Sequence, residues 1–173
     1  MIQLTYEPAF DPLHTMYRAL RLRDGAGTDQ RIPRDLFRIL DFYLLFPESL
    51  KDVRFRQEHR RLKTRAVATK RAPAYGPRPE DAALFGRMRP FQEAALDTLA
   101  RQHFFVPEAL ADGWVESGTK ALPTGLAGRI QRANTDEAAL IEALRAIAVD
   151  YPLEGIGGLK DRTGLLEHRY DAV

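Results

Sequence analysis

Apolar residues recur at the three- and four-residue spacing of α-helices along most of the chain. The clearest case is the stretch 33–46, which is apolar on most sides and predicts a helix buried at the centre of the molecule. Pro90 is expected to break a later helical pattern, because a proline inside a helix removes a hydrogen bond and clashes with the preceding turn. Further helices are predicted at residues 12–23, 80–88, 91–102 and 136–149.

Extended structure is expected in few places. Residues 104–106 are apolar and end at Pro107, which indicates a short strand that follows a helix and a turn. A helix, a turn and a short strand in this order are typical of a winged-helix module. The predicted fold class is therefore mainly α: a compact helical domain with a winged-helix-like module and little β-structure.

Charge and pattern divide the chain into two parts. Residues 1–106 form the predicted helical, winged-helix-like core, and residues 107–173 form a C-terminal helical extension. The first part carries 19 Lys and Arg against 13 Asp and Glu, whereas the second carries 7 against 11. Opposite charge balances favour two faces that meet different partners. The end of the chain, residues 151–173, is rich in glycine and charge, and we expect it to be only partly ordered.

The basic segment 51–78 makes the strongest physical case for binding. Lysines and arginines in one patch neutralise phosphates and release counterions, which gives salt-dependent and sequence-tolerant binding to nucleic acid. The alternative interpretation is a solvated surface that pairs with an acidic partner protein. The residues predicted to bind nucleic acid or a partner are Arg54, Arg56, Arg60, Arg61, Lys63, Arg65, Lys70 and Arg71.

An apolar stripe on the first predicted helix is the second candidate surface. Its members are Leu13, Met16, Tyr17 and Leu20, which fall on one helix face. Such a stripe either covers the core or forms a partner interface, and both interpretations stay open at this point.

The sequence carries no clear motif for catalysis, metal binding or cofactor binding. The chain has no cysteine, and its four histidines lack the spacing of zinc sites. The glycines in residues 155–160 fit neither the dinucleotide fingerprint nor the Walker pattern, so a turn is the preferred interpretation. Asp112, Glu116 and Lys120 approach a nuclease metal motif, but the last spacing is too long. We therefore predict no catalytic residue, no metal and no cofactor.

The cellular location is expected to be the cytoplasm, without contact with a membrane. The first eight residues lack the basic start and apolar run of a signal peptide. Apolar runs along the chain are shorter than the roughly 18 residues that a membrane-spanning helix needs.

Three blocks of sequence resemble a known family. They are residues 4–14, residues 38–47, which include the run Asp-Phe-Tyr-Leu-Leu-Phe-Pro, and residues 84–96. Together they are similar to the middle components of ABC three-component (ABC-3C) systems, and most similar to the fifth class of these components. The resemblance covers about the first 100 residues, and the region past Pro107 adds little to it.

The resemblance implies a subunit of a bacterial conflict system that acts in antiviral, antiphage defence. Its partners would be an SMC-like ABC ATPase and an effector protein, often a nuclease, in a hetero-complex that reaches DNA. The middle component would couple the two as a non-catalytic accessory subunit, since the shared motifs carry no catalytic positions. The rival hypothesis from the residues alone is a stand-alone winged-helix DNA-binding regulator. An enzyme is a distant third.

Overall fold

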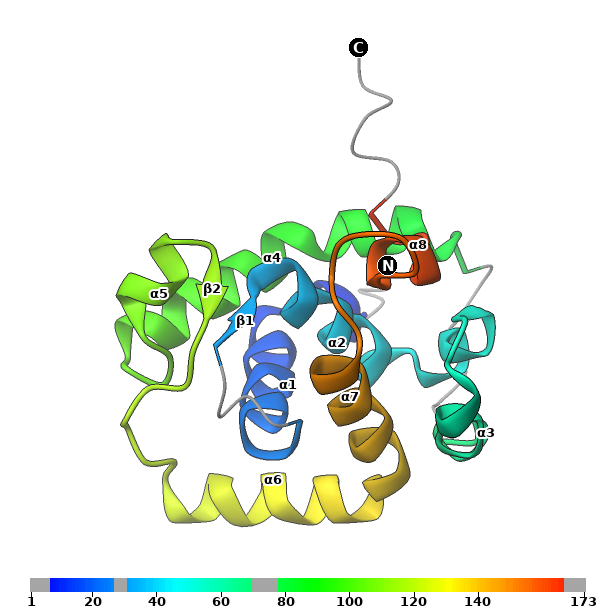
Figure 1. The fold of residues 1–173 in the computed structure, drawn as a ribbon. Helices are drawn as coiled ribbons and strands as arrows, with labels where there is room; N and C mark the ends of the chain where they lie inside the picture. The colour runs from blue at the N-terminus through cyan, green and yellow to red at the C-terminus, as the bar shows by residue number, and fades with distance from the viewer. Residues whose placement is uncertain (1–6, 27–30, 70–77, 167–173) are drawn as a thin grey trace, which may run out of the picture.

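The computed structural model describes residues 7–26, 31–69 and 78–166, and helices make up most of these residues (Figure 1). The mainly α fold class predicted from the sequence is confirmed. In chain order the elements are η1 (Pro8–Phe10), α1 (Pro12–Gly25), β1 (Ile32–Pro33), α2 (Arg34–Leu45), η2 (Pro47–Asp52), η3 (Gln57–His59), α3 (Arg60–Val67), α4 (Asp81–Arg101), α5 (Pro107–Ala111), β2 (Trp114–Val115), α6 (Thr124–Asp136), α7 (Ala138–Asp150) and α8 (Leu159–Thr163).

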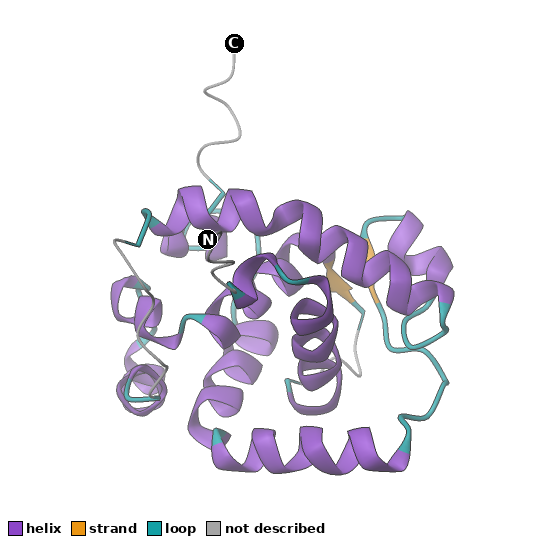
Figure 2. Cartoon of the chain, turned by 180° about the vertical axis from the view of Figure 1, so that it is seen from behind, coloured by secondary structure: helices purple, strands orange, loops and turns teal. Residues whose placement is uncertain are grey.

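Helix α2 lies at the centre of the molecule, as its apolar pattern predicts. Its residues Ile39, Leu40 and Phe42 are completely shielded from solvent. α2 contacts α1, α4 and α7, so its surroundings come from both ends of the chain. Seen from behind, α4 and α6 run along opposite sides of the molecule, with α1 and α2 between them (Figure 2). The burial of α2 on all sides makes it the scaffold on which the other helices are placed.

The start of α1 is capped by a side chain and opened by a proline. The side chain of Asp11 accepts a hydrogen bond from the His14 backbone N–H at 2.9 Å, and Pro12 occupies the first helical position. A carboxylate at this place satisfies a backbone donor that the helix leaves unpaired. The predicted start of the helix is therefore confirmed.

Helix α4 runs without interruption through Pro90, so the predicted break is wrong. Phe85 and Met88 before the proline, and Gln92 and Leu96 after it, are all buried along one side of the helix. The carbonyl that Pro90 leaves unpaired belongs to Gly86, and both of these residues are exposed, so water can reach it. Packing on both sides of the proline therefore holds the helix together.

The β-structure is small and joins distant segments. β1 and β2 pair antiparallel, with Ile32 opposite Val115 and Pro33 opposite Trp114. Within the predicted strand 104–106, Phe105 forms an isolated bridge to Ser117. The helix predicted from residue 33 begins one residue later in the structure, at Arg34, because Pro33 belongs to this strand pairing. The winged-helix module stays a prediction.

One hydrophobic core includes residues from both sides of position 106. Leu40 and Phe85 belong to it, together with Ile130 and Leu144 from the C-terminal part. Helices α6 and α7 contact α1, and α7 also contacts α2 and α3. The division at residue 106 stays a prediction. None of the helices among the described residues is both long and apolar enough to cross a membrane.

The C-terminal segment folds back onto this core through residue 166. Tyr151, Leu159 and Leu165 are buried there. The remaining residues of the segment predicted to be only partly ordered, 167–173, lie outside the described residues. Residues 151–166 are therefore part of the packed structure, and they contact the basic segment.

Candidate partner interface

The basic segment folds into short pieces rather than one helix. Residues 47–52 and 57–59 are 3-10 turns, and the α-helix α3 begins only at Arg60. On α3, the side chains of Arg60, Arg61 and Arg65 are exposed. Lys70 and Arg71, also predicted to bind, lie outside the described residues. The part of the predicted patch that α3 presents to solvent therefore consists of these three arginines.

Arg65 is held only loosely on this surface. Its guanidinium lies 3.7 Å from the carboxylate of Glu142 on α7, and both side chains are more than half exposed. Exposed ion pairs of this kind contribute about 0–1 kcal/mol, so the Arg65 side chain can leave Glu142 for another anion at little cost.

Lys63 has a structural role within the molecule. Its ammonium group donates to the backbone carbonyls of Lys51, at 2.5 Å, and Val53, at 2.8 Å. These bonds tie α3 to the turn η2, which precedes it. Lys63 therefore stabilises the basic segment, unlike the exposed arginines beside it.

Arg54 and Arg56 turn toward the C-terminal segment. Arg54 forms an ion pair with Asp161 of α8 at 2.9 Å, and the guanidinium of Arg56 lies 4.9 Å from the centre of the Tyr151 ring. The guanidinium of Arg162 lies 5.2 Å from the same ring. The structure thus joins part of the predicted patch to residues more than 90 positions away in the chain.

Tyr151 connects the basic segment, at residues 54–59, to the C-terminal segment. It is 4% exposed, and its hydroxyl oxygen accepts a hydrogen bond from the Arg56 backbone N–H at 2.9 Å. The same oxygen lies 2.9 Å from His59 Nδ1, while His59 Nε2 lies 3.5 Å from the Asp150 carboxylate. Sequence inspection missed this cluster because its members come from two distant segments and follow no local motif.

The apolar stripe on α1 is mostly part of the core. Leu20 is buried, Met16 and Tyr17 are half-buried, and Leu13 is 70% exposed. Only the N-terminal end of the stripe is therefore open to solvent. The use of these residues as a partner interface stays a prediction.

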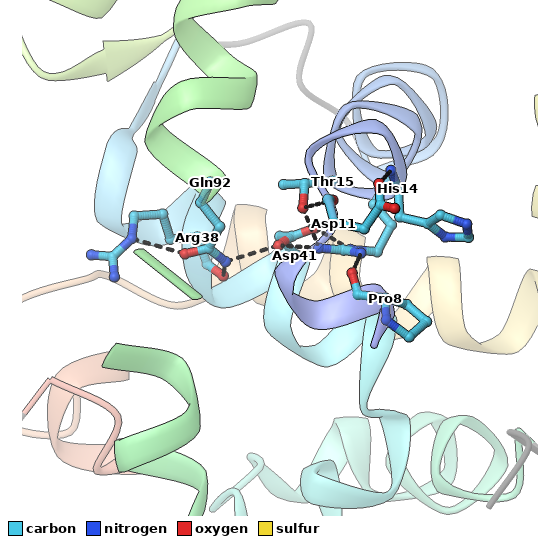
Figure 3. Close-up of polar contacts among 8 residues, drawn as sticks. Pro8, Asp11, His14, Thr15, Arg38, Asp41 and Gln92 are labelled. Atoms are coloured by element: carbon cyan, nitrogen blue, oxygen red, sulfur yellow. Dashed lines mark hydrogen bonds and ion pairs between the residues drawn. The ribbon is translucent and has the colours of Figure 1, made fainter. Parts of the chain in front are cut away.

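A buried polar chain links α1, α2 and α4, and sequence inspection missed it. Asp41 of α2 accepts hydrogen bonds from Arg18 of α1 at 2.6 Å and from the Gln92 amide of α4 at 2.8 Å. Gln92 in turn accepts from Arg38 at 3.0 Å. Figure 3 shows Arg38, Gln92 and Asp41 following one another, with Thr15 and Pro8 beyond them. Burial lowers the pKa of Arg38, and the carboxylate of Asp35 opposes this shift.

A second buried contact fixes α6 and α7 to α1. Arg21 donates to the Asn134 side chain at 2.9 Å and to the Glu137 carboxylate at 2.9 Å. Asn134 donates back to the Arg21 carbonyl at 3.1 Å. Buried polar groups that are fully hydrogen-bonded in this way favour one arrangement of the helices. Arg18 and Arg21 of α1 therefore position helices, whereas Arg60, Arg61 and Arg65 of α3 are exposed to solvent.

The described residues form no evident centre for metal chemistry. Among them, no group of three or more histidine or carboxylate side chains is placed to hold a metal ion. A hollow of about 430 Å³ lies beside the end of α3 and the junction of α6 and α7, and its polar lining includes Arg65, Thr69 and Asp136. Arg65, which lines this hollow, is one of the exposed arginines of α3.

Comparison with known proteins connects this arrangement to a family. The family model for the ABC-three component (ABC-3C) system Middle Component 5 matches residues 4–171. The match covers nearly the whole chain. It therefore includes the region past Pro107, which lies outside the three sequence blocks that carry the resemblance. The comparisons with curated proteins and with solved structures gave no match.

Proposed function

The chain belongs to the ABC-3C Middle Component 5 family, and from this membership we propose that it couples an SMC-like ABC ATPase to an effector protein. It does so as a non-catalytic subunit in defence against phage and other foreign DNA. The observation that carries the proposal is the family match, which extends from residue 4 to residue 171. An accessory role in the system follows from the family, and the coupling of two named partners is our proposal.

The surface around α3 supports this role. Arg60 and Arg61 are exposed on one short helix, and Arg65 has only a loose contact with Glu142. Exposed arginines suit binding to carboxylates or phosphates, because the guanidinium group presents several hydrogen-bond donors in a planar fork. We assign this surface to contact with another component of the system.

A coupling subunit also needs a framework that keeps its surfaces in fixed positions. The buried chain of Arg18, Asp41 and Gln92 joins three helices, and Arg21 joins α1 to α6 and α7. Helices connected in this way move together rather than independently. Because α3 packs against α7, its arginines are placed on the same framework as α1.

A second candidate function is DNA binding by the isolated chain, as a regulator. The observation that favours it is the pair of exposed arginines, Arg60 and Arg61. This function predicts tight binding to one duplex sequence, with loss of binding in the double variant Arg60→Glu, Arg61→Glu. Equal affinity for unrelated duplexes would exclude a sequence-specific regulator, since phosphate contacts carry no sequence information.

Affinity purification tests the main proposal. The tagged full chain is produced together with the other components of its system, and the retained proteins are identified by mass spectrometry. We expect the ATPase component to be retained in a fixed ratio to the chain. Recovery of the tagged chain alone, at salt concentrations near physiological, would count against the proposal and in favour of the DNA-binding regulator.

A further inference from the structure

A glycine-rich turn between α7 and α8 holds an isoleucine out into solvent. The backbone of Gly155 and Gly157 has φ values of 86° and 72°, which L-residues with side chains rarely adopt. A Cβ atom on Gly158 would lie 2.4 Å from the Glu154 carbonyl oxygen. The chain can therefore make this turn only with glycines around Ile156, whose exposure of 108% means that it gives nothing to the core.

Hydrogen bonds fix the turn in place. Within it, the Gly158 N–H donates to the Gly155 carbonyl at 2.9 Å, and the Leu159 N–H donates to the Pro152 carbonyl at 2.8 Å. The Gly157 N–H donates to the Asp161 carboxylate at 3.2 Å. An exposed aliphatic side chain on a backbone fixed in this way loses little conformational entropy when it is buried by a partner.

Arginines surround the base of this turn. Arg162 donates to the carbonyls of Gly157 and Arg54, and its guanidinium also lies against the Tyr151 ring. Arg56 lies against the same ring. The turn and the residues 54–56 therefore form one continuous surface, held together at its centre by buried Tyr151.

Both carboxylates within residues 154–162 are paired with cations. The carboxylates of Glu154 and Asp161 are each in an ion pair with a cation, Lys160 and Arg54 respectively. Among the described residues, neither Arg56 nor Arg162 lies within ion-pair distance of a carboxylate. The charge of the exposed Arg56 is therefore available to a negative group of another molecule, whereas the half-buried Arg162 donates to the Gly157 and Arg54 carbonyls and holds the turn in place.

We infer that Ile156, with Arg56 and Arg162 at its base, is a docking surface for a protein that has an apolar pocket rimmed by carboxylates. An exposed isoleucine gains free energy only when apolar atoms cover it, and a phosphate backbone offers none. Arginine is also enriched at protein interfaces, beside the apolar centre. A protein therefore fits this surface better than DNA does. The inference rests on the proposed function, because the occupant is another component of the same system.

The test compares three tagged full-length chains, each produced with the other components of the system: the parent, Ile156→Ser and the control Trp114→Ser. Both variants remove an exposed apolar side chain, and only Ile156 lies at this turn, because Trp114 belongs to β2. The retained components are quantified, the binding of each chain to duplex DNA is measured, and thermal unfolding shows whether the variants are folded. Because Ile156 touches nothing in the core, its variant should unfold at the parent's temperature.

We expect Ile156→Ser to lower the retention of one component by about tenfold, as for a central interface residue, and to leave DNA binding unchanged. Trp114→Ser should change the retention of that component by less than about twofold. Equal retention by parent and Ile156→Ser chains, or an effect of Ile156→Ser on DNA binding alone, would overturn the inference. If the parent chain itself retains nothing, the proposed function fails as well, so the two failures can be told apart.

Discussion

Arg18 Nε lies 2.6 Å from Asp41 Oδ1, and the two side chains are only 5% and 2% exposed. Arg18 also donates to the Pro8 carbonyl and to the Thr15 hydroxyl, so its guanidinium is satisfied on several sides. The pair joins α1 to α2 at the centre of the molecule. Two charges this far from water are stable only together, because removal of either one leaves the other buried without a partner.

The first prediction concerns this pair. Asp41→Asn should lower the free energy of unfolding by about 3–5 kcal/mol, because it leaves the Arg18 charge buried without a counter-ion. Urea unfolding measures the loss. The matched control is Glu93→Gln, which removes the exposed partner of Arg89 at 2.7 Å and should lower the free energy of unfolding by at most about 1 kcal/mol. Similar losses in both variants would show that Arg18 and Asp41 are not a buried pair in solution.

The second prediction concerns the turn that carries Ile156. Gly158→Ala should destabilise the protein, because the new Cβ would lie 2.4 Å from the Glu154 carbonyl oxygen and the backbone would have to shift. Gly86→Ala is the control, since nothing lies within 4 Å of a Cβ at this position in the interior of α4. The control should stabilise the helix by about 0.5–1 kcal/mol. Thermal unfolding compares the two, and an unchanged melting temperature for Gly158→Ala would contradict the described turn.

The third prediction concerns the proline inside α4. Pro90→Ala restores a backbone N–H that can pair with the exposed Gly86 carbonyl, and it removes the steric clash of the ring. The free energy of unfolding should therefore rise, by up to about 3 kcal/mol. Urea unfolding checks the sign. A loss of stability would mean that the packing of α4 depends on the geometry that the proline imposes.

The fourth prediction concerns stability at high pH. Burial raises the pKa of Tyr43, and the carboxylates of Asp81 and Asp52 raise it further. In the unfolded chain this phenol ionises near pH 10, whereas in the folded protein it stays neutral. Its contribution to stability is therefore fully present below about pH 10 and is lost as the pH rises above that value.

Urea unfolding of the parent and of Tyr43→Phe at pH 9 and pH 11 measures this contribution. Between these two values the parent should lose about 1 kcal/mol more than the variant, because only the parent has a phenol at position 43 to ionise on unfolding. Equal losses would show that the Tyr43 hydroxyl is accessible to solvent in the folded protein.

The central helix could be predicted from the sequence because its cause is local. The stretch from Leu36 to Phe46 is apolar on nearly all sides, and only a buried helix explains that pattern. Asp41 interrupts the pattern, and its explanation lies 23 positions away at Arg18. Contacts across such distances leave no periodic signal, so the buried polar chain could not be predicted. The break expected at Pro90 was wrong for a related reason, since packing partners outside the helix maintain α4.

The candidate surface was predictable only in part. The clustering of basic residues indicated a binding surface, and the exposure of Arg60 and Arg61 agrees with that hypothesis. The sequence could not reveal that Lys63 is engaged by backbone carbonyls, or that Arg56 stacks on Tyr151. Glycines between residues 155 and 158 indicated a turn, but the exposure of Ile156 depends on how that turn folds back on α8.

Omission of this chain from the assembled system tests the coupling function most directly. The ATPase component, tagged, and the effector are produced together with the chain or without it, and the effector retained on the ATPase is quantified. The account predicts that the effector is retained when the chain is present and lost when it is absent. Equal retention of the effector in both cases would contradict the proposal that this protein couples the two.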